Sequence, residues 1–445
     1  MLTRIQIKNF KRFESVDLEL GKNVVFIGPN NSGKTTILQA LALWEIGLHR
    51  WNEKKQNKAP SEKRSGVQIN RNDLISLPVP NTNLLWNDLH VRKSERSNDK
   101  QIPQNIRIDI LVEGISNDKS WTCGLEFDFA NAEFFHCRPL RLSENNPLNR
   151  MEVPLDATDT KIAFLPPMSG LAATEPLWQP GRISVLLGEG QTAQVLRNIC
   201  YQIYSKSPSG PEWNDLVSHI KELFGVMLLP PLFIKERGEI TMMFKEPSGI
   251  QLDLSSSGRG LQQTLLLLAH LYANPKTVLL LDEPDAHLEV LRQRQIYQLL
   301  TSLADKLGSQ IIAASHSEIV LNEAAGRDVV VAFVGKPHRI DDRVSQVLKA
   351  LREIGYDQYY QAEQTGWVLY LEGSTDLAIL QTLAKKLNHP ASEYLEERPF
   401  VHYIGNQPQK ARDHFFALRE AKTDLVGITI IDNIEKELQP TTKLV

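Results

Sequence analysis

The sequence predicts an α/β protein with a parallel central sheet. Three short apolar runs carry this prediction, at residues 23–27, 278–281 and 310–314. Each run is apolar almost throughout, which is typical of a strand that is buried on both faces. Each run is followed directly by glycine-rich or polar residues, and parallel α/β sheets bind their ligands beyond the carboxyl ends of their strands. We therefore expect one edge of this sheet to carry the chemistry.

Length and composition exclude several classes of protein. The chain has 445 residues, enough for two or three domains, and its 42% hydrophobic and 23% charged residues are typical of a globular protein. No apolar run approaches the roughly 18 residues of a membrane helix, and the amino terminus lacks the apolar core of a signal peptide. We therefore expect a cytoplasmic protein with no membrane partner. The net charge of -3 means that any nucleic-acid-binding surface must be local.

The first apolar run leads into a phosphate loop. Residues 28–36 read Gly-Pro-Asn-Asn-Ser-Gly-Lys-Thr-Thr, a complete G-x-x-x-x-G-K-T motif, and a helical pattern follows it. In this motif the glycines let backbone amides surround the β-phosphate, Lys34 reaches the β- and γ-phosphates, and Thr35 offers its hydroxyl to magnesium. The expected cofactors are ATP and Mg²⁺. The predicted nucleotide-binding residues are Gly28, Asn30, Asn31, Ser32, Gly33, Lys34, Thr35 and Thr36.

The second apolar run ends in two carboxylates, Asp282 and Glu283. At the carboxyl end of a buried strand, one carboxylate can hold the magnesium that accompanies a nucleotide, which is the role predicted for Asp282. Its neighbour Glu283 can orient or deprotonate the water that attacks the terminal phosphate. Residues 5–10 and 16–20 alternate between apolar and polar as half-buried strands do, and the strands expected at 106–113 and 121–129 extend the same sheet.

The segment before the phosphate loop resembles a known class of ATPase. Lys8-Asn-Phe-Lys-Arg-Phe13 followed by the phosphate loop is similar to the amino terminus of the ATPases grouped with the SMC and RecF proteins, which are an ABC-type subclass. In such heads this segment lies against the nucleotide, so the resemblance implies that Lys11 or Arg12 touches the base or a phosphate. The alternative is that both are solvated cations on an edge strand.

Two further motifs extend the resemblance. The stretch Ser255-Ser-Ser-Gly-Arg-Gly260 opens an apolar helix and resembles a loosened ABC signature motif, which in this class receives the γ-phosphate held by the opposite subunit. Its predicted cofactor-binding residues are Ser256, Ser257, Gly258 and Gly260, and the alternative is a simple helix cap. Residues 285–288 resemble the D-loop. His316, after the third apolar run, resembles the switch histidine that meets the γ-phosphate, although a lone histidine is often structural.

Two regions between these motifs are predicted to be insertions. Residues from about 50 to 100 are rich in basic side chains, which would suit either a loop that follows a DNA backbone or a solvated insertion. Residues from about 184 to 228 have helical periodicity and no sustained heptad pattern, so a compact helical segment for dimerisation or regulation replaces the coiled-coil arm of SMC proteins. We expect the ATPase domain to cover residues 1–365.

The carboxyl-terminal segment, 366–445, presents a second set of acidic residues. An apolar run at 367–371 ends in Glu372, Asp376 opens the following helix, and a second run at 426–431 ends in Asp432. This pattern resembles a small α/β TOPRIM domain, which implies that the three carboxylates are catalytic and hold Mg²⁺ or Mn²⁺. The second aspartate of the usual Asp-x-Asp motif falls on Ile434, which cannot bind a metal. Because the chain stops at Val445, soon after this strand, we expect the domain to be partial.

An SMC/RecF-like ATPase joined to a TOPRIM module resembles the OLD (overcoming lysogenization defect) family. The resemblance implies a homodimer or higher oligomer that closes on ATP, a DNA substrate and a role in bacterial defence against phage, beside a second defence protein or a retron nucleic-acid complex. The alternative is an ATPase without nuclease activity, a sensor or scaffold with a degenerate TOPRIM module. The motor of a membrane transporter fits the ABC motifs but neither end of the chain.

Overall fold

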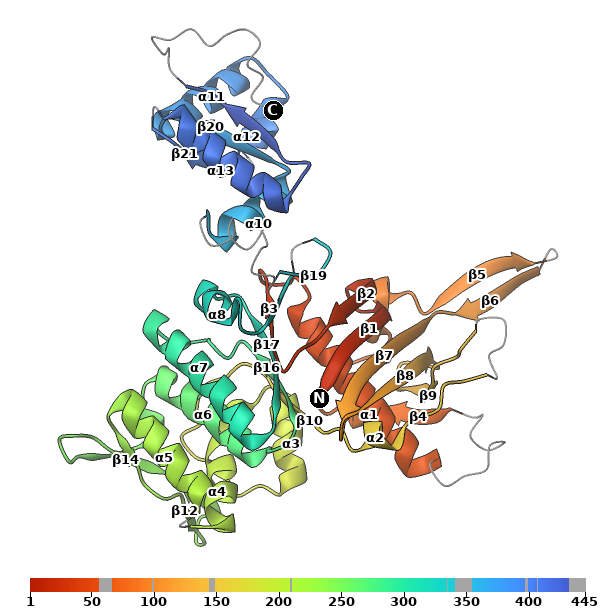
Figure 1. Cartoon of the computed structure of the whole chain (residues 1–445), viewed down its shortest axis with the longest axis vertical. Coiled ribbons are helices and arrows are strands. Elements are labelled where there is room, and N and C mark those ends of the chain that lie inside the picture. The colour runs from red at the N-terminus through yellow and green to blue at the C-terminus, as the bar shows by residue number, and fades with distance from the viewer. Residues whose placement is uncertain are drawn as a thin grey trace. The chain divides into compact units, whose positions relative to one another are not determined.

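The computed structural model describes residues 1–55, 66–97, 100–143, 149–208, 210–333, 335–340, 354–396, 399–405 and 407–431 (Figure 1). The chain divides into two compact units, Met1–Phe333 with Pro337–Arg339, and Val334–Lys336 with Ile340–Val445. Among the described residues, no helix is long and apolar enough to cross a membrane.

The first unit begins with an antiparallel sheet of six strands in the order β2-β1-β7-β8-β9-β4. Apolar and polar side chains alternate along β1 and β7, which buries one face. The prediction that later strands extend the amino-terminal sheet is confirmed, because β7 pairs with β1 and β8 with β7. The strands are β1 (Leu2–Phe10), β2 (Phe13–Glu19), β4 (Val67–Asn70), β7 (Arg107–Ser116), β8 (Lys119–Phe129) and β9 (Phe134–Pro139).

The second sheet is the predicted parallel sheet, with strand order β10-β16-β17-β3-β18-β19. Every pair is parallel except the last, in which β19 runs antiparallel to β18. All residues of β16 and β17 are buried, as their apolar sequences predict. The strands are β3 (Asn23–Ile27), β10 (Ile162–Leu165), β16 (Val278–Asp282), β17 (Gln310–Ser315), β18 (Val329–Ala332) and β19 (His338–Arg339).

Helix α1 (Lys34–Lys55) packs against strands of both sheets, and the core around it includes Phe26, Leu41 and Trp44. A second core lies on the other side of the parallel sheet, under helices that Figure 1 draws in yellow and green. These helices are α3 (Pro180–Gly188), α4 (Leu196–Lys206), α5 (Pro211–Phe224), α6 (Arg259–Ala273) and α7 (Val290–Leu307). The short helices α2 (Leu155–Thr158) and α8 (Glu318–Ala324) complete the unit.

The region from 184 to 228 contains most of α3 and all of α4 and α5, and short strands follow these helices. The short strands are β11 (Met227–Leu228), β12 (Leu232–Ile234), β13 (Glu239–Thr241), β14 (Met243–Lys245) and β15 (Gln251–Asp253). Single 3-10 turns occur as η2 (Arg71–Asp73), η3 (Thr82–Leu85), η4 (Asn87–Leu89), η5 (Thr192–Gln194) and η6 (Leu254–Ser256).

The basic region from about 50 to 100 is more ordered than the loop the sequence suggested. It contains the last turns of α1, the strand β4, which pairs with β9, and the first strand of a hairpin formed by β5 (Arg92–Ser97) and β6 (Lys100–Asn105). The antiparallel sheet thus takes β4 from this region. The predicted basic residues Lys58, Lys63 and Arg64 lie outside the described residues.

The second unit contains a parallel sheet of three strands in the order β21-β20-β22. Its strands are β20 (Trp367–Leu371), β21 (Val401–Tyr403) and β22 (Val426–Thr429), and its helices are α10 (Tyr356–Thr365), α11 (Ser374–Lys386), α12 (Ala391–Glu396) and α13 (Pro408–Ala421). The compact units divide between residues 333 and 340, whereas the sequence placed the boundary at 365–366. The reason is α10, which packs against β20 and α13.

Candidate functional site

The phosphate loop connects β3 to α1, where its motif predicts it. Two of its residues have left-handed backbone angles, Asn31 with φ of 62° and Gly33 with φ of 106°. A Cβ atom on Gly33 would lie 2.6 Å from the Phe13 ring, so neither the backbone angle nor the space admits a side chain. The motif glycine is therefore fixed by local geometry. The exposed side chain of Arg12 donates a hydrogen bond to the Asn31 carbonyl, which ties the amino-terminal hairpin to the loop.

Lys34 lies inside the loop, and its side chain is buried. Its Nζ donates hydrogen bonds to the carbonyl oxygens of Gly28 at 2.6 Å and Pro29 at 2.7 Å. Burial lowers the pKa of Lys34, and this effect is opposed by the carboxylates of Glu283 and Asp282. A lysine in this position can transfer its hydrogen bonds from the loop carbonyls to phosphate oxygens.

Thr35 and Asp282 meet at the carboxyl edge of the parallel sheet. The Thr35 hydroxyl Oγ1 lies 3.0 Å from each carboxylate oxygen of Asp282, although 247 positions separate them in sequence. Burial raises the pKa of Asp282 to about 6, and the hydrogen bond from Thr35 opposes the shift. A hydroxyl and a carboxylate are both oxygen ligands of the kind that magnesium prefers. The predicted metal pair Thr35 and Asp282 is thus in position to hold a magnesium ion.

Glu283 and His316 lie at the ends of adjacent strands. The Glu283 backbone has φ of 49°, and its N–H donates to the Ala314 carbonyl at 2.8 Å. Its Oε1 lies 3.8 Å from His316 Nδ1, and the two side chains are 33% and 50% exposed, so both are accessible to a ligand. Strand β17 pairs with both β3 and β16, which delivers His316 between the phosphate loop and the carboxylates. Glu283 and His316, which the sequence predicted as two residues of one ATP site, thus lie next to each other in the structure.

Asp285 was not among the predicted site residues, but its position relates it to the site. Its carboxylate is buried, burial raises its pKa, and the hydrogen bond with Ser315 lowers it. Its Oδ1 has no hydrogen-bond partner, and the same is true of the buried hydroxyl of Ser32 in the phosphate loop. Unpartnered buried polar atoms on both sides of the Thr35 and Asp282 pair fit a site that binds nucleotide and magnesium. The signal for Asp285 was its position in the D-loop-like stretch.

Lys11 is partly buried and is not the solvated surface cation that the sequence left as an alternative. Its Nζ donates to Gln39 Oε1 on α1 at 2.6 Å and lies 5.8 Å from the centre of the Phe10 ring. Burial lowers the pKa of Lys11 to about 8. Arg12 is exposed and contacts the phosphate loop, so it is the better candidate of the two for contact with the nucleotide.

The signature-like segment forms a tight turn before α6. Ser256 Oγ donates to the Asp253 carbonyl at 2.6 Å, and Ser257 Oγ donates to the Leu254 carbonyl at 2.7 Å. Gly258 is the N-cap of the 15-residue helix α6 and offers no side-chain cap, so no capping side chain accepts from the first N–H groups of this helix. The first turn of α6 lies next to the D-loop-like stretch, since a Cβ added to Gly260 would lie 3.4 Å from the His287 carbonyl. The geometry suits an anion site at the start of α6.

In the second unit, Glu372 follows β20 and Asp376 lies in the first turn of α11. Asp376 Oδ2 accepts a hydrogen bond from the Gly373 N–H at 2.8 Å, so this carboxylate caps its own helix. Strand β22 runs parallel to β20 with Thr429 opposite Tyr370, and continuing this register places Ile431 opposite Glu372. Asp432 and Ile434 lie outside the described residues. Within the described residues, no cluster of three histidine, cysteine, aspartate or glutamate side chains could hold a metal.

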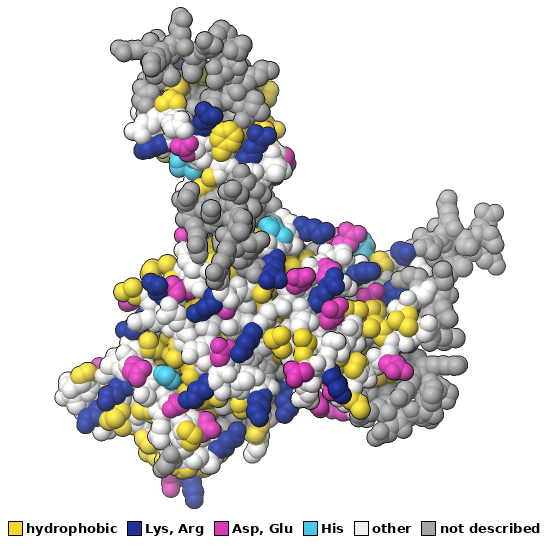
Figure 2. Space-filling view, viewed as in Figure 1, with side chains coloured by type: hydrophobic (Ala, Val, Ile, Leu, Met, Phe, Trp, Pro, Cys, Tyr) yellow, Lys and Arg dark blue, Asp and Glu magenta, His cyan; other side chains and the backbone are white. Residues whose placement is uncertain are grey.

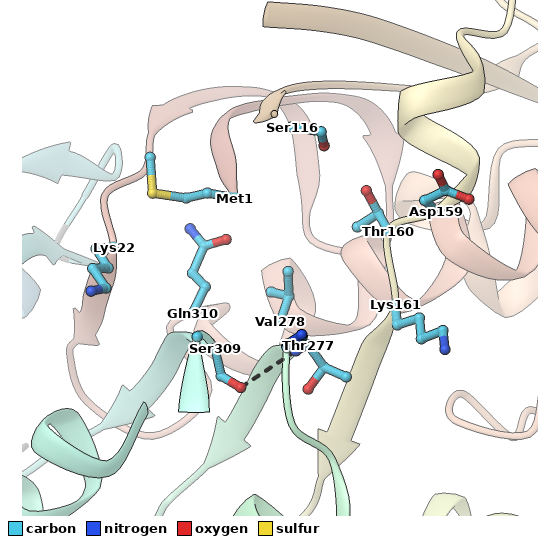
Figure 3. A pocket seen from close by; sticks show the side chains of 12 residues that line it. Met1, Lys22, Ser116, Asp159, Thr160, Lys161, Thr277, Val278, Ser309 and Gln310 are labelled. Carbon is cyan, nitrogen blue, oxygen red and sulfur yellow. Dashed lines mark hydrogen bonds between the residues drawn. The ribbon is translucent and has the colours of Figure 1, made fainter. Parts of the chain in front are cut away.

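A cavity of about 250 Å³ lies at the opposite edge of the parallel sheet, below the starts of β16 and β17. Figure 3 places Lys22 and Lys161 on opposite sides of this cavity, with Ser309 and Gln310 between them. Gln310 is held by hydrogen bonds with the backbone of Leu2 and Gly21. This cavity is therefore separate from the phosphate loop. On the face shown in Figure 2, basic and acidic side chains are interspersed over the first unit, as the small net charge suggests.

Comparison with known proteins supports the ATPase motifs. A family model described as "AAA ATPase domain" matches residues 1–117, and one described as "AAA domain, putative AbiEii toxin, Type IV TA system" matches residues 194–322. An OLD nuclease of Thermus scotoductus is 25% identical over 375 residues, which cover 79% of this chain and 65% of that protein. The oligopeptide transport ATP-binding protein AppD of Bacillus subtilis is 35% identical over 77 residues, 17% of this chain and 23% of that protein.

Solved structures of SMC heads are also similar. The SMC head domain from Thermotoga maritima has 16% identity and a TM-score of 0.39, with 76% of this chain and 98% of that chain covered. An SMC head domain from Pyrococcus furiosus bound to the carboxyl-terminal domain of ScpA has 14% identity and a TM-score of 0.41, with 79% and 99% covered. Because both TM-scores are low, the fold assignment depends on the strand order and phosphate loop described above.

These findings confirm the predicted resemblance to an OLD nuclease and to P-loop ATPases. The chain is a P-loop ATPase with an α/β fold that binds ATP. It spans about two thirds of the length of the OLD nuclease, 65%, and less than a quarter of the transport protein, 23%.

Proposed function

We propose that this chain is an ATPase whose nucleotide cycle controls a TOPRIM-type, metal-dependent DNA endonuclease in bacterial defence against phage. The observation that supports the ATPase half of this proposal is the contact between Thr35 and Asp282, 3.0 Å long, beside the buried Lys34. The resemblance to the Thermus OLD nuclease supports the second half.

The residues of the ATP site have different proposed roles in hydrolysis. Lys34 and the loop amides bind the β- and γ-phosphates, while Thr35 and Asp282 would hold magnesium. When bound, magnesium neutralises charge that develops on the phosphate oxygens. Glu283 orients the attacking water and accepts its proton, and His316, 3.8 Å from Glu283, donates a hydrogen bond to the γ-phosphate.

The proposed oligomer is a homodimer in which the signature segment of each copy meets the ATP of the other. Two apolar side chains next to the D-loop-like stretch support it. Val290 is 60% exposed and Leu291 is 74% exposed at the start of α7. Large exposed apolar side chains beside a nucleotide site are typical of a surface that is covered in a complex.

The proposed nuclease centre consists of Glu372, Asp376 and Asp432, with Mg²⁺ or Mn²⁺ as its metal. The parallel pairing of β20 and β22 supports it, because the carboxyl ends of adjacent parallel strands lie at one edge of a sheet. The metal ions would activate water and stabilise the leaving oxygen of a phosphodiester. DNA is the substrate class proposed, and a second defence protein or a retron complex is the proposed partner.

The ATPase half is tested with Glu283→Gln. Because glutamine cannot accept the proton of the attacking water, kcat should fall by about 100-fold or more, while the affinity for ATP stays within twofold. The variant should also accumulate as an ATP-bound dimer in sedimentation velocity. The exposed Glu152→Gln serves as the matched control. Unchanged hydrolysis in Glu283→Gln would remove this carboxylate from the role.

The nuclease half is tested by plasmid nicking with Mg²⁺ and with Mn²⁺. Glu372→Ala and Asp432→Ala should each abolish nicking without changing ATP hydrolysis, and the exposed Glu393→Ala in α12 should nick like the parent. If the parent and the two acidic-site variants behave alike, the chain is not a nuclease.

A second candidate function follows from Ile434, which occupies the place of a metal-binding aspartate. In this alternative the second unit binds DNA or a partner protein without cutting it, and the ATPase acts as a sensor or scaffold. ATP-dependent DNA retention without nicking, measured in a filter-binding assay, is the outcome that would favour it.

A further inference from the structure

Arg197 is a charged residue buried far from the phosphate loop in sequence. It lies on α4 and is 1% exposed. Its Nη1 donates to the Ala172 carbonyl at 2.8 Å, and its Nη2 donates to Asp253 Oδ1 at 3.0 Å. A buried guanidinium is costly to desolvate, so both ends of its fork need partners.

A second buried carboxylate fixes the position of Arg197. Glu175 is 0% exposed, and its Oε2 accepts a hydrogen bond from the Arg197 backbone N–H at 3.0 Å and lies 3.8 Å from Nη1. Its Oε1 accepts two further bonds from Asn198, at 2.6 Å from N and 2.7 Å from Nδ2. Glu175 therefore holds the first turn of α4 in place, and the guanidinium spans the Ala172 carbonyl and Asp253.

Asp253 joins this network to the signature-like segment through a single atom. Its Oδ1 accepts from Arg197 and also from both the N–H of Ser255, at 2.8 Å, and the Ser255 hydroxyl, at 2.6 Å. Burial would raise the pKa of Asp253, but the hydrogen bonds from Ser255 and the charge of Arg197 hold it below its ordinary value. The carboxylate therefore stays charged and starts the turn η6 that leads to Gly258.

The ion pair between the buried Arg197 and Asp253 is better explained by the position that it defines than by the stability that it adds. Replacing buried ion pairs with apolar residues is often neutral or stabilising, so a buried pair is better evidence for a defined position than for stability. The position defined here is that of residues 255–258, which set where α6 begins. A displacement of about 1 Å in a phosphate-binding group can cost on the order of 100-fold in rate.

We propose that Arg197 is a positioning residue, which acts through Asp253 to hold the signature-like turn in the conformation that receives the γ-phosphate of a second copy. This inference rests on the proposed function of that turn. Because Arg197 lies on α4, which is part of the predicted helical insertion, a change in the conformation of that insertion would change the rate of ATP hydrolysis.

The test uses Asp253→Ala and Arg197→Lys in the full chain. Lysine keeps the charge but cannot reach both acceptors of the guanidinium fork. Each variant should lower kcat at least tenfold. It should also raise the protein concentration needed for half-maximal turnover at least tenfold. The affinity for ATP at low protein concentration should stay within twofold. The carboxylate of Asp215, which pairs with Lys306 at 2.7 Å between α5 and α7, provides the control Asp215→Asn, with kcat unchanged.

A double variant distinguishes coupling between Arg197 and Asp253 from two independent losses of activity. If Arg197 acts through Asp253, the double variant Arg197→Lys/Asp253→Ala is no slower than the slower single variant. Multiplied losses in the double variant would overturn the proposal, as would kcat within twofold of the parent in Asp253→Ala. Because Asp253→Ala leaves the 1% exposed Arg197 without one of its partners, thermal unfolding of each variant is measured beside its turnover, and a variant counts only if it unfolds as cooperatively as the parent.

Ser257→Arg distinguishes failure of this inference from failure of the proposed function. A bulky side chain at the start of α6 should abolish turnover if the turn receives a γ-phosphate. Normal turnover in Ser257→Arg would remove the signature assignment and the positioning role together. Loss of turnover in Ser257→Arg with normal turnover in Asp253→Ala would overturn the positioning role alone.

Discussion

Two strands of this chain, β16 and β20, end in carboxylates, but their surroundings differ. Strand β16 lies inside a six-stranded sheet, and its Asp282 is 8% exposed. Strand β20 lies in the middle of three strands, and the Glu372 that follows it is only partly buried. Burial raises the pKa of Asp282 to about 6 and lowers that of Lys34. The chemistry of the carboxylate at the end of β16 therefore depends on the sheet that buries it.

The difference extends to how each carboxylate is held. Asp282 accepts from a hydroxyl that would itself bind magnesium, so the two ligands are oriented before the ion arrives. Asp376 accepts from the backbone of Gly373 and therefore has a structural task in addition to the metal role proposed for it. Substitutions of Asp282 should change catalysis with little change in stability, and substitutions of Asp376 should change both.

The largest expected effect is on ATP hydrolysis in Lys34→Ala. Removing the cation that contacts the β- and γ-phosphates should lower kcat/KM by on the order of 100- to 1,000-fold. A steady-state phosphate-release assay measures the effect. Lys22→Ala removes a lysine at the opposite edge of the same sheet and should hydrolyse ATP like the parent.

Two closely packed glycines of the two units differ in their backbone conformation. Gly33→Ala places a Cβ 2.6 Å from Phe13 at φ of 106°, so the free energy of unfolding should fall by about 1–3 kcal/mol. Gly427→Ala in β22 places a Cβ 2.7 Å from the ring of Phe415, but no left-handed backbone angle is involved and the ring can move. Its cost should be about 1 kcal/mol. Denaturant unfolding of both variants tests the ranking, which equal losses would contradict.

The parts of the site that could be predicted from the sequence are those formed by short continuous motifs. The phosphate loop, the Asp282 and Glu283 pair and the strand before His316 are each contained in fewer than ten consecutive residues, so their structure follows from propensity and turn chemistry. The parallel sheet could be predicted for the same reason. The contact between Thr35 and Asp282 also followed, because both motifs end strands of one sheet.

Long-range polar contacts of residues outside the recognised motifs could not be predicted. The pair formed by Arg197 and Asp253 joins residues 56 positions apart, and nothing in the local sequence of α4 marks one arginine as buried. The sequence left Lys11 either as a nucleotide contact or as a solvated cation, because its partner Gln39 lies beyond the phosphate loop in the chain. The place of α10 could not be predicted for a related reason: this helix is polar in sequence, yet Gln358 bonds with His414 of α13.

A smaller effect is expected from the double role of Asp376. Asp376→Ala removes the cap of α11 and should lower the stability of the second unit by about 1 kcal/mol. Asp376→Asn keeps an acceptor for the Gly373 N–H and should unfold like the parent, yet it removes a charge from the proposed metal site. Hydrogen exchange of α11 and plasmid nicking measure the two roles separately. If both variants nick normally, the carboxylate is only a cap.

The smallest effect at neutral pH comes from His414, a partly buried histidine of the second unit. Its Nδ1 lies 2.9 Å from the Tyr370 hydroxyl, its Nε2 lies 2.7 Å from Gln358, and its ring stacks on His402 at 3.9 Å. Burial, and then the neighbouring His402, lowers the pKa of His414 to about 4. The neutral ring is therefore favoured in the folded unit.

Because the folded pKa is below the ordinary value of 6.5, the stability contributed by neutral His414 is fully present above pH 6.5. It should be lost progressively as the pH falls from 6.5 toward 4, since the unfolded chain binds a proton that the folded unit resists. Hydrogen exchange of α13, corrected for the intrinsic effect of pH, should show this loss in the full chain. His414→Gln should flatten the profile, whereas His389→Gln, an exposed histidine of the same unit, should follow the parent. A profile that stays equally steep in His414→Gln would assign the acid sensitivity to another group.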